Sequence, residues 1–174
     1  IARTRYEDLG AECIDRVKQA IQDGIAVAIA GANEEAVNIV AAHVRSFGAK
    51  PQSTVWGHGF KSSPVHAAYV NGSAMHVLDF EPMWSPPTHA MSPTVPAAFA
   101  LAESHGCNGK QIVAAVAKGM EIQGRMQFAG NQYVPEKLRF HAPGVAGVMG
   151  AAVTAGHILK LDEQRLRYAL GIAG

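Results

Sequence analysis

Residues 71–103 read NGSAMHVLDFEPMWSPPTHAMSPTVPAAFALAE, and this stretch decides the fold. Two apolar, helix-like runs flank a loop crowded with prolines, namely Pro82, Pro86 and Pro87. Each proline fixes φ and removes a backbone donor, so the loop loses little entropy on ordering and cannot continue either helix. We therefore expect a helix, a stiff loop and a second helix. Asp79 and His89 lie near the ends of these helices, and a carboxylate beside an imidazole suits general acid/base chemistry.

Helical periodicity continues on both sides of this stretch. Apolar side chains recur at three- and four-residue steps, bounded by capping residues and glycines. The expected helices span residues 11–30, 36–47, 64–78, 94–105, 110–126, a run beginning at 144, and 163–171. The expected N-caps are Ser63, Ser92, Asn108 and Asp162. The predicted fold class is all-α, a multi-helix bundle with room for one short β segment near residues 53–56 and no strand after it.

Glycines at residues 144, 147 and 150 punctuate one of these helices. Glycine is costly in an isolated helix, but it lets another backbone approach closely. We therefore expect this helix to be central in the bundle.

Composition argues against several classes of function. The chain has 174 residues, 48% hydrophobic and 17% charged, which is typical of a soluble globular domain. A formal net charge of +1 without a dense basic cluster argues against nucleic-acid binding. The longest apolar runs are interrupted within a few residues, so we expect no membrane span. Cys13 and Cys107 are isolated, and we expect both to be small buried hydrophobes in a reducing compartment.

The ordered motifs around the proline-rich loop resemble one protein family. They are His76-Val-Leu-Asp79-Phe80, then Trp84 and Thr88-His89, then residues 96–103, PAAFALAE. Together they resemble the helical domain of the MmgE/PrpD family, which includes 2-methylcitrate dehydratases and cis-aconitate decarboxylases. Blocks at residues 24–31, 67–72, 140–144 and 169–174 also follow the family's order, so the resemblance spans nearly the whole chain.

The resemblance carries expectations about domains and partners. It makes residues 1–174 the front part of a helical domain, with the rest of this domain and an α+β domain beyond Gly174 and a short segment before Ile1. Subunits of the family pair through the helical domain, so a homodimer is expected, whereas nucleic acid and membrane are not expected partners. The expected location is the cytoplasm, or the mitochondrion in a eukaryote.

The candidate catalytic residues are Asp79, His89 and His141. From pattern alone, Asp79 could equally terminate local backbone, and His89 would more often be an inconsequential loop histidine. The resemblance implies that Asp79 orients a histidine or the substrate and that His89 is a general acid/base or a carboxylate binder. His141 precedes the glycine-punctuated helix, whose N-terminal N–H groups attract anions, so it is expected to bind carboxylate. Packing of His141 on Phe140 as a cap is the alternative.

The candidate substrate-binding residues are His76, Met83, Trp84 and Thr88. On a helix, His76 would share a face with Asp79 and could be its hydrogen-bond partner, and a satisfied core histidine fits the pattern equally well. Met83 and Trp84 either wall the pocket or hold the loop on the core. Many family members have Asp-Thr where this chain has Pro82-Met83, which leaves substrate specificity open.

No metal or cofactor is expected. His76, Asp79, Glu81 and His89 are acceptable ligand types, but their spacing matches no metal motif. The family's chemistry is regarded as independent of metals and cofactors. The glycines after His141 lie within a helical run and do not form a dinucleotide fingerprint.

The residues and the resemblance predict a cofactor-independent lyase for a small di- or tricarboxylate, either a decarboxylase or a dehydratase. Removing CO₂ or water requires groups that hold carboxylates and one that moves a proton, and imidazole titrates near neutral pH. The loop spacing resembles the decarboxylase more closely. Lys61, Lys137 and Arg139 are low-ranked sources of positive charge. The alternatives are an isomerase or epimerase of a related dicarboxylate and a non-catalytic helical oligomerisation module. Further active-site residues of the family would lie past Gly174, so this chain alone should be an incomplete catalyst.

Overall fold

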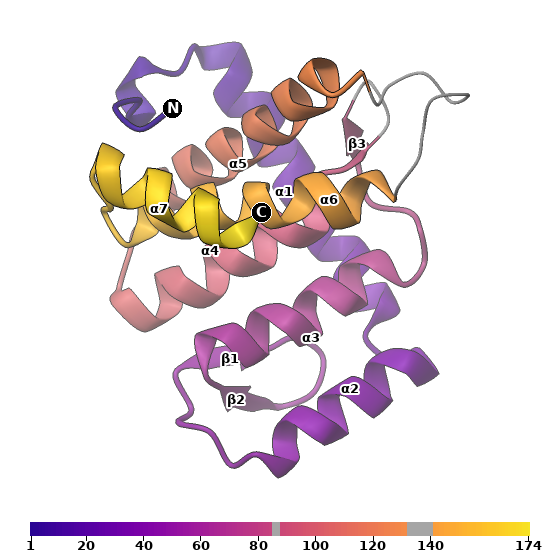
Figure 1. Ribbon diagram of the computed structural model, residues 1–174. Helices are drawn as coiled ribbons and strands as arrows, with labels where there is room; N and C mark the ends of the chain where they lie inside the picture. The colour runs from indigo at the N-terminus through magenta and orange to yellow at the C-terminus, as the bar shows by residue number, and fades with distance from the viewer. Residues whose placement is uncertain (85–87, 132–140) are drawn as a thin grey trace.

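The computed structural model describes residues 1–84, 88–131 and 141–174. Over these ranges the chain is mostly helical, with two short two-stranded sheets (Figure 1). The helical elements are η1 (Tyr6–Asp8), α1 (Ala11–Gly31), α2 (Glu35–Ser46), α3 (Pro64–His76), α4 (Met91–His105), α5 (Gly109–Ala129), α6 (Ala142–Ile158) and α7 (Glu163–Ala173). The predicted fold class, helical with a minor β element, is confirmed.

The helices fall into two groups, which are joined by α1 and by the direct packing of α3 on α4. Figure 1 shows η1, α4, α5, α6 and α7 in the upper group, and α2, α3 and the first hairpin in the lower group. α1 packs on α3, α4 and α5 and so contacts both groups.

No single described helix has the length and apolar character to cross a bilayer. α1 and α2 meet that criterion only as a pair, and they are bent by 88° at the break between them.

Two antiparallel strand pairs interrupt the helical fold. β1 (Ser53–Val55) pairs with β2 (Phe60–Ser62), and Ser53 Oγ donates to the carbonyl of Ala100 at 2.6 Å, which fixes this hairpin on α4. The predicted short β segment near residues 53–56 therefore has a partner strand. The prediction of no later strand was wrong, because β3 (Met83–Trp84) pairs with β4 (Thr88–His89). None of these four residues is proline, so each keeps the backbone N–H that a ladder requires.

Three of the four predicted N-caps are confirmed. The side chains of Ser63, Asn108 and Asp162 each accept a hydrogen bond from a first-turn backbone N–H, in α3, α5 and α7 respectively. The prediction for Ser92 was wrong: α4 begins at Met91, and Ser92 lies within its first turn. The backbone N–H groups of Met91 and Ser92 donate instead to the carboxylate of Glu81. A side chain from the preceding loop thus caps α4.

α6 lies against several other elements, as its glycine spacing predicted. It packs on α4, α5, α7 and β4, and its packing with α5 is the most extensive among the described elements. A Cβ at Gly119 of α5 would lie 2.9 Å from the carbonyl oxygen of Gly150, so the two backbones approach too closely for a side chain there. A Cβ at Gly147 would lie 3.2 Å from Cγ of Pro93 on α4. The expectation of a central helix is therefore confirmed.

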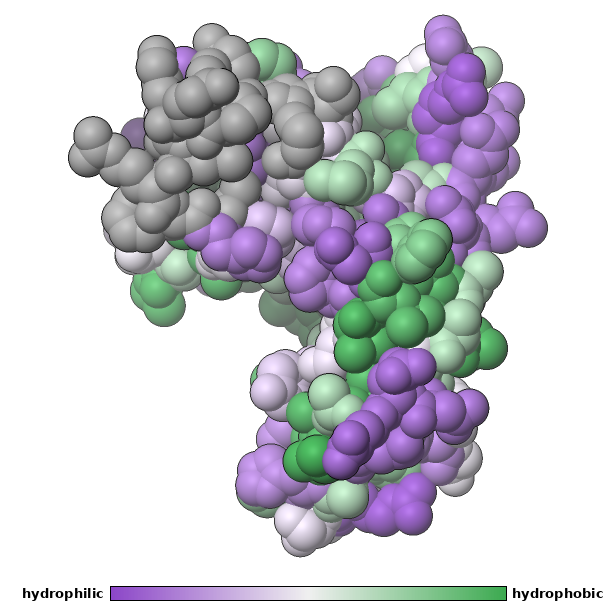
Figure 2. Space-filling model, turned by 90° about the vertical axis from the view of Figure 1, so that its right-hand side faces the viewer, coloured by the Kyte–Doolittle hydropathy of each residue, from purple (hydrophilic) through white to green (hydrophobic). Residues whose placement is uncertain are grey.

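Part of the surface is apolar. Val145 and Val148 of α6 and Ile172 of α7 are exposed. Figure 2 shows an apolar area at mid-height of the face it draws, between polar areas above and below.

Cys107 is partly buried, but Cys13 lies on the exposed face of α1. The expectation of burial was therefore wrong for Cys13.

Candidate active site

The β3–β4 ladder positions His89. Met83 lies opposite His89 and Trp84 opposite Thr88, and β4 also contacts α6. The residue after His89 is the N-cap of α4, so the histidine is held at the start of a core helix. The other predicted participants in or near this region lie outside the described residues: Pro86, Pro87, Lys137, Arg139 and Phe140.

Asp79 faces His89 from the end of α3. The helix ends at His76, and Asp79 adopts a left-handed backbone conformation with φ of 57°. This conformation turns the chain out of the helix, and aspartate tolerates it better than most residues. Asp79 Oδ1 lies 3.1 Å from His89 Nε2; the aspartate side chain is 78% exposed and that of His89 only 12%. A solvent-facing carboxylate therefore contacts one nitrogen of a nearly buried imidazole.

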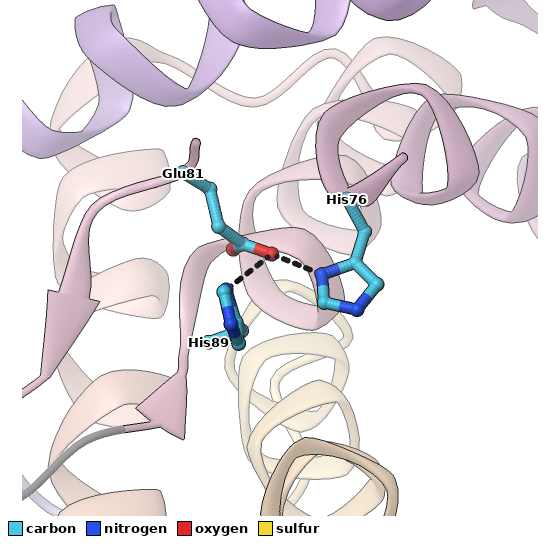
Figure 3. A group of neighbouring side chains, drawn as sticks. All are labelled: His76, Glu81 and His89. Carbon is cyan, nitrogen blue, oxygen red and sulfur yellow. Dashed lines mark hydrogen bonds and ion pairs between the residues drawn. The ribbon is translucent and has the colours of Figure 1, made fainter. Parts of the chain in front are cut away.

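Glu81 is the buried centre of the site, and the sequence reasoning missed its role. Its side chain is fully buried, and Oε1 lies 2.8 Å from His76 Nδ1 and 3.4 Å from His89 Nδ1. Figure 3 shows the carboxylate between the two imidazoles. Its other oxygen, Oε2, accepts the N–H groups of Met91 at 3.1 Å and Ser92 at 2.5 Å. A carboxylate at a helix N-terminus is favoured by the helix dipole and by free N–H donors.

The contacts to Glu81 differ in quality. The His76 contact is a hydrogen bond, whereas His89 Nδ1 lies within ion-pair distance and has no aligned hydrogen-bond partner. His89 therefore has a carboxylate oxygen near each ring nitrogen, Asp79 on the exposed side and Glu81 on the buried side. In the protonated ring both nitrogens carry donors, so this arrangement suits a histidine that gives and receives a proton.

His76 and His141 complete the cluster. The ring centroids of His76 and His89 are 4.7 Å apart, and those of His76 and His141 are 6.1 Å apart. His141 is exposed and is the N-cap residue of α6, but its side chain makes no capping hydrogen bond. The suggested pairing of His76 with Asp79 was wrong: its described carboxylate partner is Glu81, because α3 ends before Asp79 and helical spacing no longer applies.

The other three predicted residues differ in burial. Trp84 packs on α5, where a Cβ at Gly124 would overlap the indole ring. Thr88 is 1% exposed, whereas Met83 is 54% exposed. Trp84 therefore holds the loop on the core, one of the two roles expected for it, and Met83 is available to a ligand at the surface.

Buried polar atoms without partners lie on the elements next to this cluster. They are Trp84 Nε1, Thr88 Oγ1, Gln123 Oε1 and both amide atoms of Gln127. Gln123 is fixed through its Nε2, which donates to the carbonyl of Ala90, the residue after His89. Native proteins rarely leave such groups unsatisfied, and they often mark the place of a ligand. The sequence reasoning missed both glutamines, since it treated this helix only as a source of apolar side chains.

Among the described residues, one group has the composition of a metal site. His76, Glu81 and His89 each offer one ligand atom, and these atoms all lie within 4.8 Å of one another. The sequence spacing did not indicate this grouping, because α3, the loop and β4 bring the three together only in the fold. Glu81 Oε2 is already occupied by two backbone N–H groups, so only its Oε1 faces the histidines.

The structure therefore brings the three predicted catalytic residues into one region, together with His76. His76 and His89 adjoin Glu81, Asp79 adjoins His89, and His141 adjoins His76. These side chains offer acid/base groups on a partly exposed rim. The N-terminus of α6, next to His141, adds backbone donors that favour an anion. Lys61, in contrast, forms an ion pair with Glu103 at 2.6 Å. The arrangement suits proton transfer to or from a small anionic molecule.

Comparisons with known proteins identify the family of this chain. A family model described as the MmgE/PrpD N-terminal domain matches residues 1–174. The cis-aconitate decarboxylases of Mus musculus and Homo sapiens are each 34% identical to this chain over 165 residues, which cover 92% of the chain and 34% of each relative. The cis-aconitate decarboxylase of Aspergillus terreus is 30% identical over 175 residues, covering 96% of the chain and 35% of that relative. The chain thus spans about a third of the length of these relatives. It belongs to the MmgE/PrpD family.

Proposed function

We propose that the full-length protein containing this chain is a carboxy-lyase that removes CO₂ from a small tricarboxylate of the cis-aconitate type. The observation that carries the proposal is His89, held between Asp79 and Glu81 and adjoined by His76. The printed names of the relatives support the choice of decarboxylation over other lyase reactions. Independence from cofactors, a homodimeric state and a cytoplasmic location stay predictions.

The reaction sets clear demands on the site. Decarboxylation breaks the bond between a chain carbon and a carboxylate carbon, CO₂ leaves, and the electron pair stays on the chain. One proton must then be delivered to carbon. The remaining carboxylates must be held while this happens, because a misplaced substrate loses most of the rate advantage. The protein therefore needs one proton donor and several hydrogen-bond donors for anions.

His89 is the proposed proton donor. Its Nε2 faces the exposed rim where Asp79 lies, and its Nδ1 faces the buried carboxylate of Glu81. The two carboxylates lie beside the two ring nitrogens and so orient the ring for proton transfer. Because Glu81 is anchored by two backbone N–H groups of α4, it cannot turn away from the histidines.

His76 and His141 are the proposed carboxylate binders. Their rings are 6.1 Å apart, and both are more open to solvent than His89. The free N–H groups in the first turn of α6 add donors beside His141. Thr88, the residue before His89, has a buried hydroxyl that lacks a partner among the described residues, so it is available to a polar ligand.

The test is an assay of the full-length protein with cis-aconitate and, separately, with 2-methylcitrate. CO₂ release from cis-aconitate is the expected result, with no alkene formed from 2-methylcitrate. Alkene formation without CO₂ would replace the decarboxylase proposal with a dehydratase. Inactivity on both substrates, in a protein shown to be folded, would reject the proposed reaction and favour an isomerase or a non-catalytic helical module.

A further inference from the structure

A second cluster of ionisable groups lies at the opposite end of α6. It lines a cavity of about 200 Å³ formed by the N-terminal segment, α5, the end of α6 and the start of α7. The basic residues that line it are Arg3, Arg5, Lys118, His157 and Lys160. None of the described lining residues carries a carboxylate. The charged side chains that line the cavity are therefore cationic, and Glu163 and Asp8 lie beside Arg3 and Arg5.

Lys118 is the unusual member of this cluster. It is 5% exposed, and its Nζ lies 2.9 Å from His157 Nδ1. Burial and the nearby Lys118 lower the pKa of His157 to about 4, so the imidazole is neutral at physiological pH and accepts from the ammonium. Burial likewise lowers the pKa of Lys118, opposed by the charge of Asp8. A buried ammonium with a neutral partner retains most of its desolvation cost.

The carboxylates around the cavity are directed to other cations. Asp8 lies 3.7 Å from Arg5 Nε, and Glu163 lies 3.5 Å from a guanidinium nitrogen of Arg3. Neither is hydrogen-bonded to Lys118 in the described part of the chain. An anion entering the cavity would therefore meet Lys118 as a donor whose described hydrogen-bond partner is neutral, with Asp8 acting on it only through its charge.

The last carbonyls of α6 do not prevent anion binding. The carbonyls of Ala155, Gly156 and His157 accept hydrogen bonds from the N–H groups of residues 159, 161 and 160 respectively. These bonds reduce the negative partial charge that a helix C-terminus presents.

The cavity is remote from the candidate active site. His141 begins α6 and His157 lies in its last turn. At 1.5 Å per residue the two ends are about 24 Å apart. A ligand of a few carbon atoms cannot reach both ends.

We propose that Lys118, with His157 and the basic rim residues of this cavity, binds a small oxyanion of the carboxylate or phosphate type at a site separate from the histidine–carboxylate cluster. This inference does not depend on the proposed lyase activity. The anion would supply the missing ionic partner of Lys118, and a cavity of about 200 Å³ admits an anion of a few heavy atoms. Charge-assisted hydrogen bonds of this kind are among the stronger polar interactions in proteins.

The test is isothermal titration calorimetry of the full-length protein with inorganic phosphate and, in a second arm, with succinate. Saturable binding of at least one anion is expected, and the two arms distinguish phosphate from carboxylate recognition. Lys118→Met should weaken the affinity at least about tenfold, since it removes the buried charged donor. Lys18→Met, which removes an exposed charge on α1, is the matched control and should bind as the parent does.

Two further variants keep the test decisive. Lys160→Met alters only an exposed rim residue and should weaken binding about two- to fivefold, so it replaces Lys118→Met if that variant does not fold. His89→Ala should leave anion binding unchanged. Absence of saturable binding by the parent protein would overturn the proposal. Undiminished binding by a folded Lys118→Met protein would also overturn it. If Lys118→Met does not fold, undiminished binding by Lys160→Met has the same consequence. Binding that is lost only in His89→Ala would likewise overturn the proposal.

Discussion

The two ends of α6 use histidine in opposite electrostatic surroundings. At the N-terminal end, His76 and His89 adjoin the carboxylates of Asp79 and Glu81. At the C-terminal end, His157 adjoins the ammonium of Lys118. The first arrangement provides acceptors for imidazole protons, whereas the second opposes protonation of the ring. The same side chain is therefore suited to proton transfer at one end and to neutral packing at the other.

The difference also concerns how each charge is compensated. Glu81 is fully buried, yet it has four described contacts, two to histidines and two to backbone N–H groups. Lys118 is nearly as buried and has one described hydrogen bond, to a neutral ring. The charge of Glu81 is therefore compensated by described groups of the protein, whereas that of Lys118 is left for the proposed anion to compensate.

The largest effect is expected from Glu81→Ala. This change leaves two helix N–H groups and His76 without their acceptor, so the free energy of unfolding should fall by about 3 kcal/mol. Urea titration of the full-length protein measures it. Glu121→Ala is the control, because Glu121 forms an exposed i,i+4 pair with Arg125 and should cost no more than about 0.5 kcal/mol. Equal losses of unfolding free energy in the two variants would show that Glu81 does not anchor the site.

A smaller effect, confined to activity, is expected from Asp79→Asn. Asparagine tolerates the left-handed backbone at φ of 57°, so stability should stay within about 0.5 kcal/mol of the parent. Turnover should fall about a hundredfold, because the neutral amide is a weaker acceptor for Nε2 of His89 and orients the ring less firmly. Steady-state kinetics and thermal unfolding test both statements. Asp79→Ala should additionally lose about 1 kcal/mol of stability through backbone strain. Full activity of the Asp79→Asn protein would show that the reaction does not need the Asp79 carboxylate.

The other end of α6 should respond to pH. The pKa of His157 is lowered to about 4 by burial and by Lys118, whereas in the unfolded chain the side chain has the ordinary pKa of histidine, 6.5. Between these values the unfolded state binds more protons, so stability is fully present above pH 6.5 and falls as the pH drops toward 4. We expect a loss of about 2 kcal/mol relative to His157→Gln, measured by urea unfolding at pH 7 and pH 4.5. Parallel pH profiles of the two proteins would contradict the lowered pKa.

The smallest effect is expected from metal removal. His76, Glu81 and His89 could together hold an ion, but the proposed chemistry needs none. Treatment of the full-length protein with a chelator should therefore change turnover less than about twofold, as a proton-transfer mechanism requires no Lewis acid. Metal analysis of the same sample shows whether an ion was removed. If the chelator abolished turnover and added zinc restored it, His76, Glu81 and His89 would be identified as metal ligands.

Local signals predicted most of the fold. Ser63, Asn108 and Asp162 were recognised as N-caps because the donors that they accept lie within the same turn. Gly106 ends α4 with φ of 64°, as glycine after a helix usually does. These interactions span few residues and leave a pattern in the sequence.

The sequence analysis did not predict the interactions between residues that are far apart in the chain. Ser92 has the local pattern of a cap, but Glu81, eleven residues earlier, accepts its N–H. His76 contacts Glu81 rather than Asp79, one of the two arrangements considered for it, for the related reason that the helix ends at His76. Gln127 has two buried amide atoms without partners, yet nothing in its local sequence distinguishes it from an exposed glutamine. The burial of Gln127 becomes apparent only in the fold, where α5 packs against Trp84 of β3.

The most direct test of the account compares His89→Ala with His43→Ala in the full-length protein, using CO₂ release from cis-aconitate. His43 is an exposed histidine on α2 and serves as the matched control. If the histidine–carboxylate cluster carries the reaction, kcat/KM of His89→Ala falls about 10²–10⁴-fold while its unfolding temperature stays near that of the parent, and His43→Ala remains active. A folded His89→Ala protein that releases CO₂ as fast as His43→Ala would contradict the account.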